Sequence, residues 1–242
     1  MSAATPIAAP DRDALLAAYG LPDRETHRVR MNFVASLDGA ATLDGRSGGL
    51  GDASDRLAMQ VLRTLADVVL VGAGTVRVEG YGGVAVSEAD AAWRVAHGLP
   101  EQPRLAVVSS ALALDPSAAF FTAAVTRPIV VTHAGAPEAR REALEPVADV
   151  IVVGEHAVDV RAMLDVLAVR GLRQVLCEGG PHLFGTLLEA DLVDELCLSL
   201  SPMLVGGDAG RIVRGAAELE RGMHLVHAMP AGDLVLLRYA RG

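Results

Sequence analysis

The chain has 242 residues, of which 51% are hydrophobic and only 3% aromatic, a composition that can form one large buried core. Its formal charge of −9 argues against nucleic acid as a partner, because phosphate contacts require clustered cations. All of its basic side chains are arginines, so lysine-based chemistry is excluded. No apolar run is long enough to cross a membrane, and the first residues do not resemble a secretory signal. We therefore expect a cytoplasmic protein without a membrane partner.

The predicted elements alternate along most of the chain. Residues 1–22 are interpreted as an N-terminal tail with a short helix at 11–19, and residues 23–242 as a single domain. Apolar β-like runs lie at 29–36, 68–72, 105–109, 128–132, 150–153, 174–177, 195–201 and 234–239. Helical periodicity is found at 53–66, 88–97, 137–146, 158–169 and 181–190. The alternation predicts an α/β fold with a mostly parallel central sheet and helices on both faces. The last runs lack helices between them, which predicts an antiparallel C-terminal edge.

The clearest candidate site follows the run at 174–177. Glu178 ends the predicted strand, Gly179 and Gly180 form a turn, and Pro181 occupies a first helical position, where its missing N–H is not needed. Glycines let a phosphate approach the backbone, and a helix N-terminus offers free N–H groups and the positive end of its dipole. A plain strand–turn–helix joint is the structural alternative.

Three further glycine turns follow apolar runs. They contain Ser36–Gly39 with the following loop to Ser47, Gly72–Thr75, and Gly206–Gly207. The turn at 72–75 lacks the G-x-G-x-x-G spacing of dinucleotide-binding proteins, because no glycine stands at the third position. Taken together, four glycine turns with hydroxyls and charges beside them predict a phosphate-bearing ligand at the carboxyl edge of the sheet.

The cysteines and histidines indicate no further chemistry. Cys177 and Cys197 lie in apolar runs, which predicts buried free thiols rather than a disulfide. The seven histidines are scattered, and only His224 and His227 approach metal-ligand spacing, so no metal site is predicted.

The ordered set of motifs resembles the reductase domain of bifunctional riboflavin deaminase/reductases and the stand-alone pyrimidine reductases. The resemblance extends from about Arg28 to Tyr239 and rests on Ser36-Leu37-Asp38-Gly39, Gly74-Thr75, Glu178-Gly179-Gly180-Pro181, and Pro202 with Gly206-Gly207. It implies a dihydrofolate-reductase-like fold. It also implies reduction of a ribosylamino-pyrimidine 5′-phosphate to the ribitylamino compound with NADPH as the cofactor.

The resemblance also implies roles for individual residues. The neighbourhood of Gly180 would hold the pyrophosphate of NADPH, and Ser110 or Ser109 would lie near its adenosine end. The candidate cofactor residues are Gly72, Gly74, Ser110, Gly179, Gly180, Pro181, Gly206 and Gly207. The candidate substrate residues are Asn32, Ser47, Arg63 and Thr75. Proton transfer to the substrate requires an acid, for which the candidates are Glu178, Asp38 and Glu79.

Two departures from the family pattern leave the substrate open. Many members carry a basic residue where this chain has Asn32, and an Asp pair where it has Glu79-Gly80. One alternative is a reductase of a pterin or folate-like ring, with Asp38 or Glu79 as the carboxylate that binds the ring. A nucleotide-binding protein that has lost the pyrimidine substrate is the other. The zinc signature of the deaminase domain is missing, so the preceding deamination is not expected.

Two further expectations concern the partner and the cofactor. The apolar run at 192–205 predicts an edge strand and a homodimer interface, which agrees with a family that is commonly dimeric. A nearby arginine would favour NADPH over NADH by meeting the 2′-phosphate, and the candidates are Arg104, Arg140 and Arg141.

Overall fold

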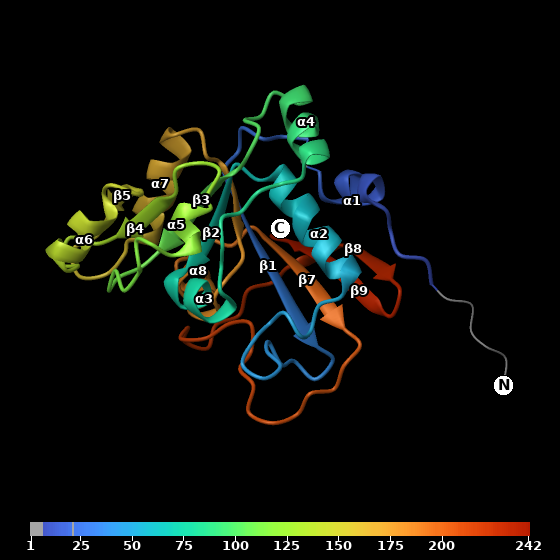
Figure 1. Ribbon diagram of the computed structural model, residues 1–242. Coiled ribbons are helices and arrows are strands. Elements are labelled where there is room, and N and C mark those ends of the chain that lie inside the picture. The colour runs from blue at the N-terminus through green and yellow to red at the C-terminus, as the bar shows by residue number, and fades with distance from the viewer. Residues whose placement is uncertain (1–6, 21) are drawn as a thin grey trace, which may run out of the picture.

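The computed structural model describes residues 7–20 and 22–242. Its nine strands form one sheet in the order β5-β4-β3-β2-β6-β1-β7-β9-β8 (Figure 1). Neighbouring strands are parallel except for the antiparallel pairs β7–β9 and β8–β9, so the predicted C-terminal edge is confirmed. The strands are β1 (Arg28–Ser36), β2 (Val68–Gly72), β3 (Arg104–Val108), β4 (Ile129–Thr132), β5 (Asp149–Val152), β6 (Gln174–Cys177), β7 (Glu195–Ser201), β8 (His224–Ala231) and β9 (Leu234–Ala240).

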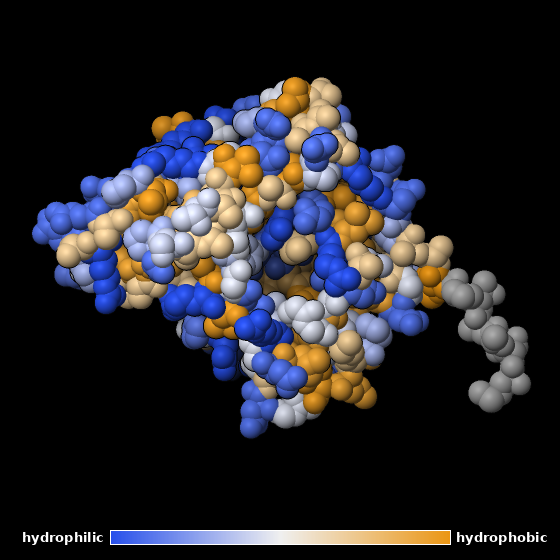
Figure 2. All heavy atoms as spheres, in the orientation of Figure 1, coloured by the Kyte–Doolittle hydropathy of each residue, from blue (hydrophilic) through white to orange (hydrophobic). Residues whose placement is uncertain are grey.

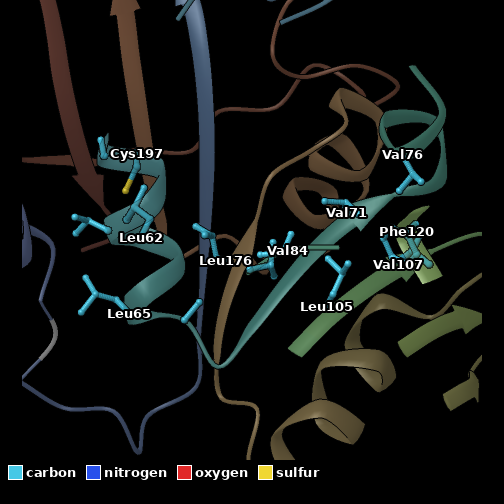
Figure 3. Packing of buried hydrophobic residues seen from close by; sticks show 14 of the residues in the cluster. Leu62, Leu65, Val71, Val76, Val84, Leu105, Val107, Phe120, Leu176 and Cys197 are labelled. Carbon is cyan, nitrogen blue, oxygen red and sulfur yellow. The ribbon is translucent and has the colours of Figure 1, made fainter. Parts of the chain in front are cut away.

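Helices pack on both faces of the sheet. They are α1 (Arg12–Tyr19), α2 (Ala53–Leu65), α3 (Ala73–Glu79), α4 (Glu88–Ala96), α5 (Ala119–Thr122), α6 (Glu138–Leu144), α7 (Val160–Val169) and α8 (Pro181–Glu189). Apolar side chains of α1, α2, α3, α5 and α6 join one core cluster (Figure 3), and those of α7 and α8 pack on the opposite face. No helix within residues 7–20 and 22–242 is long and apolar enough to cross a membrane.

The path of the chain creates a crevice at the carboxyl ends of the central strands. From β2 the chain runs outward to β5, and α7 then carries it back to β6, which lies between β2 and β1. Helix α8 leaves β6 toward one face of the sheet, whereas α2 and α3 leave β1 and β2 toward the other. Open α/β sheets bind ligands at such a reversal of strand order.

Three elements differ from the sequence-based expectation. The run at 192–205 contains β7, which lies inside the sheet between β1 and β9, so its prediction as an edge strand is wrong and β8 forms that edge. Helices α3 and α5 have only seven and four residues, too few for periodicity to reveal. Strand β8 is absent from the predicted β-like runs, because its side chains are mostly exposed and show no clean alternation.

Helix α1 shares the core of the domain. Leu15 and Tyr19 are buried against α2, and Arg238 of β9 donates a 2.7 Å hydrogen bond to the carbonyl oxygen of Ala18. The sequence analysis groups α1 with the N-terminal tail, in residues 1–22. In the structure α1 packs against α2, which belongs to the domain of residues 23–242. Residues 1–6 of that tail lie outside the described residues.

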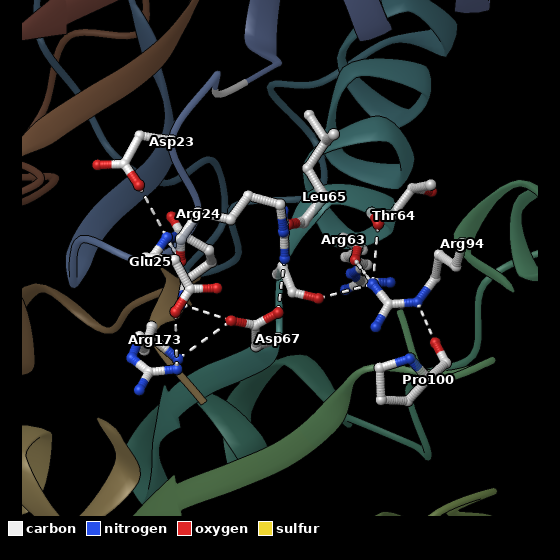
Figure 4. A network of polar contacts seen from close by, with 12 residues as sticks. Asp23, Arg24, Glu25, Arg63, Thr64, Leu65, Asp67, Arg94, Pro100 and Arg173 are labelled. Atoms are coloured by element: carbon white, nitrogen blue, oxygen red, sulfur yellow. Dashed lines mark hydrogen bonds and ion pairs between the residues drawn. The ribbon is translucent and has the colours of Figure 1, made fainter. Parts of the chain in front are cut away.

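A buried arginine closes the C-terminal end of α2. Arg94 of α4 has no exposed surface and donates hydrogen bonds to the carbonyl oxygens of Thr64 (2.8 Å), Ala66 (2.6 Å) and Pro100 (2.8 Å) (Figure 4). The last carbonyls of a helix have no partner within it, so these bonds replace the missing ones. Burial lowers the pKa of Arg94 to about 10, which leaves it charged at neutral pH. The contacts fix the turn of α2 that carries Arg63.

The substitution Arg94→Met should lower the free energy of unfolding by roughly 3 kcal/mol, because it leaves buried carbonyl oxygens without donors. Urea denaturation at pH 7 measures the change. Arg170→Met, at an exposed position, serves as the control and should cost less than about 0.5 kcal/mol. Equal stabilities of the two variants would contradict the capping role.

Candidate active site

One cavity of about 330 Å³ opens at the carboxyl ends of β1 and β6. Figure 2 shows it as a hollow near the centre of the molecule, between α2 and α3. Nine of the residues singled out in the sequence line it, namely Asn32, Ser47, Arg63, Thr75, Glu79, Glu178, Gly179, Gly180 and Pro181. The strand order therefore brings together side chains that are up to 149 positions apart, as the distance from Asn32 to Pro181 (181 − 32) shows.

A buried ion pair forms one wall of the cavity. Arg63 of α2 donates from Nε and Nη2 to the two carboxylate oxygens of Glu178, each over 2.7 Å. The Tyr81 hydroxyl donates to the same carboxylate and accepts from Arg63 Nη2 at 3.1 Å. Burial by itself lowers the pKa of Arg63, but the neighbouring Glu178 carboxylate raises it above the usual value. Arg63, for which a substrate contact is predicted, therefore already holds a carboxylate of the protein.

A second contact joins the loop after β1 to α3. The backbone N–H and the hydroxyl of Ser47 both donate to Glu79 Oε1, over 2.9 and 3.0 Å. Ser47 and Glu79 both line the cavity. One oxygen of the Glu79 carboxylate already accepts both of these hydrogen bonds. This contact holds the glycine-rich loop against α3.

A glycine cradle borders the cavity at the start of α8. The Gly72 N–H donates to the Gly179 carbonyl oxygen at 2.7 Å, and Gly179 has a positive φ of 103°. A Cβ on Gly180 would come within 2.6 Å of Thr75 Oγ1, so only glycine fits there. No side chain caps the N-terminus of α8, and its first N–H groups can therefore meet an anion.

Asp38, Gly206 and Gly207, which are also predicted site residues, lie outside the lining of this cavity. The Asp38 carboxylate accepts hydrogen bonds from the N–H groups of Val205 and Gly206 and thus ties the loop after β1 to the loop after β7. Bonds from the Ser36 hydroxyl and from these N–H groups lower the pKa of Asp38 to about 2. Asp38 therefore stays ionised, which is unsuited to proton donation.

The remaining predicted cofactor residues lie around the cradle or beyond it. Gly72 packs against Gly180, whereas Gly74 and Ser110 are exposed outside the cavity. Of the three arginines considered for the 2′-phosphate, Arg104 pairs with Asp149 at the opposite ends of the strands and Arg141 pairs with Glu138. Arg140 donates to the carbonyl oxygen of Ala111, the residue after Ser110. Of these three arginines, Arg140 is thus the one that lies next to Ser110.

Sequence reasoning missed Asp55, Arg56 and Tyr81, which all line the cavity. Asp55 lies in the first turn of α2, and its pKa is raised, chiefly by burial, although the Ser199 side chain of β7 acts to lower it. Gly51 makes room for it, because a Cβ there would come within 2.2 Å of Asp55 Oδ2. Acidic residues are common in the first turn of a helix, so the sequence did not mark Asp55 as a candidate site residue. Tyr81, just after a glycine, carried no signal.

The raised pKa of Asp55 has a consequence for stability. The folded state favours the protonated carboxyl, so ionisation of Asp55 destabilises the protein as pH rises through that pKa. Asp55→Asn should therefore raise the melting temperature by roughly 2–4 °C at pH 7. Below about pH 4, where an unfolded aspartate also takes up its proton, the difference should disappear. Thermal unfolding at pH 7 and pH 3.5 tests this, with exposed Asp44→Asn as the control. A variant less stable than the parent at pH 7 would refute it.

The comparison with known families agrees with the motifs of this cavity. Residues 27–237 match the family of RibD C-terminal domains. The chain belongs to this family. A 2,5-diamino-6-ribosylamino-4(3H)-pyrimidinone 5′-phosphate reductase of Archaeoglobus fulgidus is 30% identical over 195 residues, which cover 80% of this chain and 89% of that protein. The riboflavin biosynthesis protein RibD of Escherichia coli is 29% identical, and the match spans half of its length.

Solved structures share the architecture of this RibD C-terminal domain. A pyrimidine reductase-like protein of Corynebacterium diphtheriae superposes with a TM-score of 0.84 at 27% identity, covering 93% of this chain and 97% of that one. A riboflavin biosynthesis reductase of Saccharomyces cerevisiae superposes with a TM-score of 0.67 at 18% identity, covering 93% and 94%, which shows the fold alone. The expected dihydrofolate-reductase-like α/β fold is confirmed.

Proposed function

We propose that this RibD C-terminal domain is an NADPH-dependent reductase that converts a ribosylamino-pyrimidine 5′-phosphate into its ribitylamino product. The observation that carries the proposal is a single cavity that joins a glycine cradle to the buried Arg63–Glu178 pair. The name of the Archaeoglobus fulgidus relative describes a reductase of such a compound, which supports the same chemistry here.

The glycine cradle fits a dinucleotide pyrophosphate. Gly180 leaves no room for a side chain beside Thr75, and the first N–H groups of α8 face away from any capping side chain. These groups would hold the pyrophosphate, and Arg140 with Ser110 would meet the 2′-phosphate. When bound, NADPH supplies a hydride from its nicotinamide ring.

The residues of the cavity have separate tasks in this reaction. The ribosylamine opens to an imine as its N–H proton passes to the ring oxygen, C1′ accepts the hydride, and the imine nitrogen accepts a proton from water. Glu178 accepts two hydrogen bonds from Arg63 at the wall of the cavity, and we assign it the orientation of N–H or O–H groups of the substrate. Arg56, exposed at the cavity, is the arginine available for the substrate phosphate.

Two variants separate the two halves of the site. Gly180→Ala should abolish NADPH binding, because its Cβ collides with the Thr75 hydroxyl. Glu178→Gln should keep the NADPH affinity within about threefold but lower kcat by roughly 100-fold or more, because it acts on the substrate side. NADPH titration by fluorescence, followed by absorbance loss on adding the ribosylamino-pyrimidine phosphate, measures both effects.

The exposed Glu142→Gln on α6 is the control and should match the parent. Binding of neither NADPH nor NADH by the parent protein would overturn the reductase proposal. Binding without oxidation would support the nucleotide-binding alternative. An equal loss of NADPH affinity and turnover in Glu178→Gln would remove the substrate-side role of that residue.

A pterin or folate-like ring is a second candidate substrate. Three carboxylates and two arginines line the cavity, and one of these arginines is already held by Glu178. A neutral ring with N–H donors meets such a lining with less electrostatic cost than a phosphate dianion. The same NADPH oxidation assay should therefore be run with dihydrofolate. If the protein oxidises NADPH with dihydrofolate and not with the ribosylamino-pyrimidine phosphate, the substrate is the folate-like ring.

We further propose that two copies of the chain associate through the sheet face opposite α2. Leu198 of β7 and Leu237 of β9 lie half-buried there, beside Leu225 of β8, which is 55% exposed. Large exposed aliphatic side chains on a sheet face favour a protein partner.

Leu198→Arg should convert the dimer into a monomer, because it places a charge inside the interface. Light scattering after size-exclusion chromatography measures the mass. Val169→Arg on α7, which replaces a side chain that is 89% exposed, is the matched control and should leave the mass unchanged. A monomeric parent protein at micromolar concentration would refute the dimer.

A further inference from the structure

Tyr81 lies between the active-site cavity and a second cavity of about 630 Å³. Of the residues that line these two cavities, Tyr81 alone belongs to both. Helix α3 forms the rest of the partition, because Thr75 and Glu79 line the active-site cavity whereas Val76 and Arg77 line the second one. The aromatic ring of Tyr81 therefore continues this wall beyond the end of α3.

The hydroxyl of Tyr81 completes a closed set of three hydrogen bonds. It donates to Glu178 Oε2, and Arg63 Nη2 donates both to this hydroxyl, over 3.1 Å, and to Glu178 Oε2, over 2.7 Å. The Arg63 guanidinium also lies 5.8 Å from the centroid of the Tyr81 ring, within the range of a cation–π contact. The same arginine thus holds the ring and the hydroxyl of Tyr81 in place.

This arrangement makes the two oxygens of Glu178 unequal. In the described part of the chain, Oε2 accepts from Arg63 Nη2 and from the Tyr81 hydroxyl, whereas Oε1 accepts from Arg63 Nε only. A carboxylate oxygen has about two acceptor sites, so Oε2 is filled and Oε1 keeps one site for a ligand donor. Without the Tyr81 hydroxyl, both oxygens would have an open site, and the donor could bind in two positions.

We infer that Tyr81 is a positioning residue of the active site and acts through Glu178. Its hydroxyl fills Oε2 and so directs the N–H or O–H group of the substrate to Oε1, while its ring closes the wall of the cavity. This inference rests on the proposed reductase function, in which Glu178 orients the substrate. A substrate held in one position keeps C1′ in line for the hydride, and small misplacements of reacting atoms lower the rate steeply.

A double-mutant cycle tests whether Tyr81 acts through Glu178. Tyr81→Phe removes the hydroxyl and keeps the ring, and it should lower kcat by about tenfold with the NADPH affinity within about twofold of the parent. In a Glu178→Gln background the same substitution should change kcat by less than about twofold, because the carboxylate on which it acts is already gone. NADPH oxidation with the ribosylamino-pyrimidine phosphate gives kcat, and fluorescence titration gives the NADPH affinity.

Two further variants separate the ring from the hydroxyl. Tyr81→Ala also opens the wall between the cavities, so it should raise KM by roughly tenfold in addition to lowering kcat, whereas Tyr81→Phe should keep the parental KM. Tyr239→Phe on β9, which removes a phenolic hydroxyl outside both cavities, is the matched control and should keep the parental kcat and KM. Thermal unfolding checks that each variant is folded.

Two kinetic outcomes overturn the inference while the reductase proposal stands. One is a Tyr81→Phe variant with the parental kcat. The other is a loss of equal size in the parental and Glu178→Gln backgrounds, because an effect that adds independently does not act through Glu178.

A parent protein that binds NADPH without oxidising it refutes the reductase proposal instead. Calorimetry of the ribosylamino-pyrimidine phosphate on the NADP⁺-loaded protein then decides about Tyr81 without hydride transfer. Binding to the parent at least about fivefold tighter than to Tyr81→Phe supports the positioning role. Equal affinities, or no binding at millimolar concentration, overturn it.

Discussion

The ion pair between Arg63 and Glu178 connects the two parts of the chain that build the site. Arg63 comes from the helix after β1, and Glu178 comes from the end of β6, 115 residues later. Both side chains are largely buried, so each charge needs the other, and removal of one partner would leave an uncompensated charge. Arg94 fixes the end of α2, and Tyr81 adds a third group to the pair. The position of α2 against the sheet therefore sets the shape of the cavity.

The carboxylates at and near the cavity have different hydrogen-bond partners. Glu178 accepts hydrogen bonds from Arg63, Glu79 accepts hydrogen bonds from Ser47, and Asp38 links two loops. Asp55 also lines the cavity, and its pKa is raised chiefly by burial. Acidic residues of one type thus acquire different roles from their environments, as their hydrogen-bond donors and exposure dictate.

The sheet and most helices could be predicted from the sequence because apolar periodicity in β1, β6 and α2 agrees with their burial. The glycine cradle was predictable for a local reason, since Gly179, Gly180 and Pro181 form one contiguous turn. Long-range contacts could not be predicted from the sequence. Asp38 is hydrogen-bonded to residues 167 and 168 positions away, and Arg63 pairs with Glu178 across 115 positions. A carboxylate in a turn or in a first helical turn looks the same whether it binds a loop or a ligand.

The most direct test of the account follows the hydride itself. The protein would be incubated with NADPH deuterated at nicotinamide C4 and the 2-amino ribosylamino-pyrimidine phosphate, and the product analysed by mass spectrometry and NMR. The account predicts one deuterium at C1′ of a ribitylamino product. A product without deuterium, or one with deuterium on the pyrimidine ring and none at C1′ of the sugar, would contradict it.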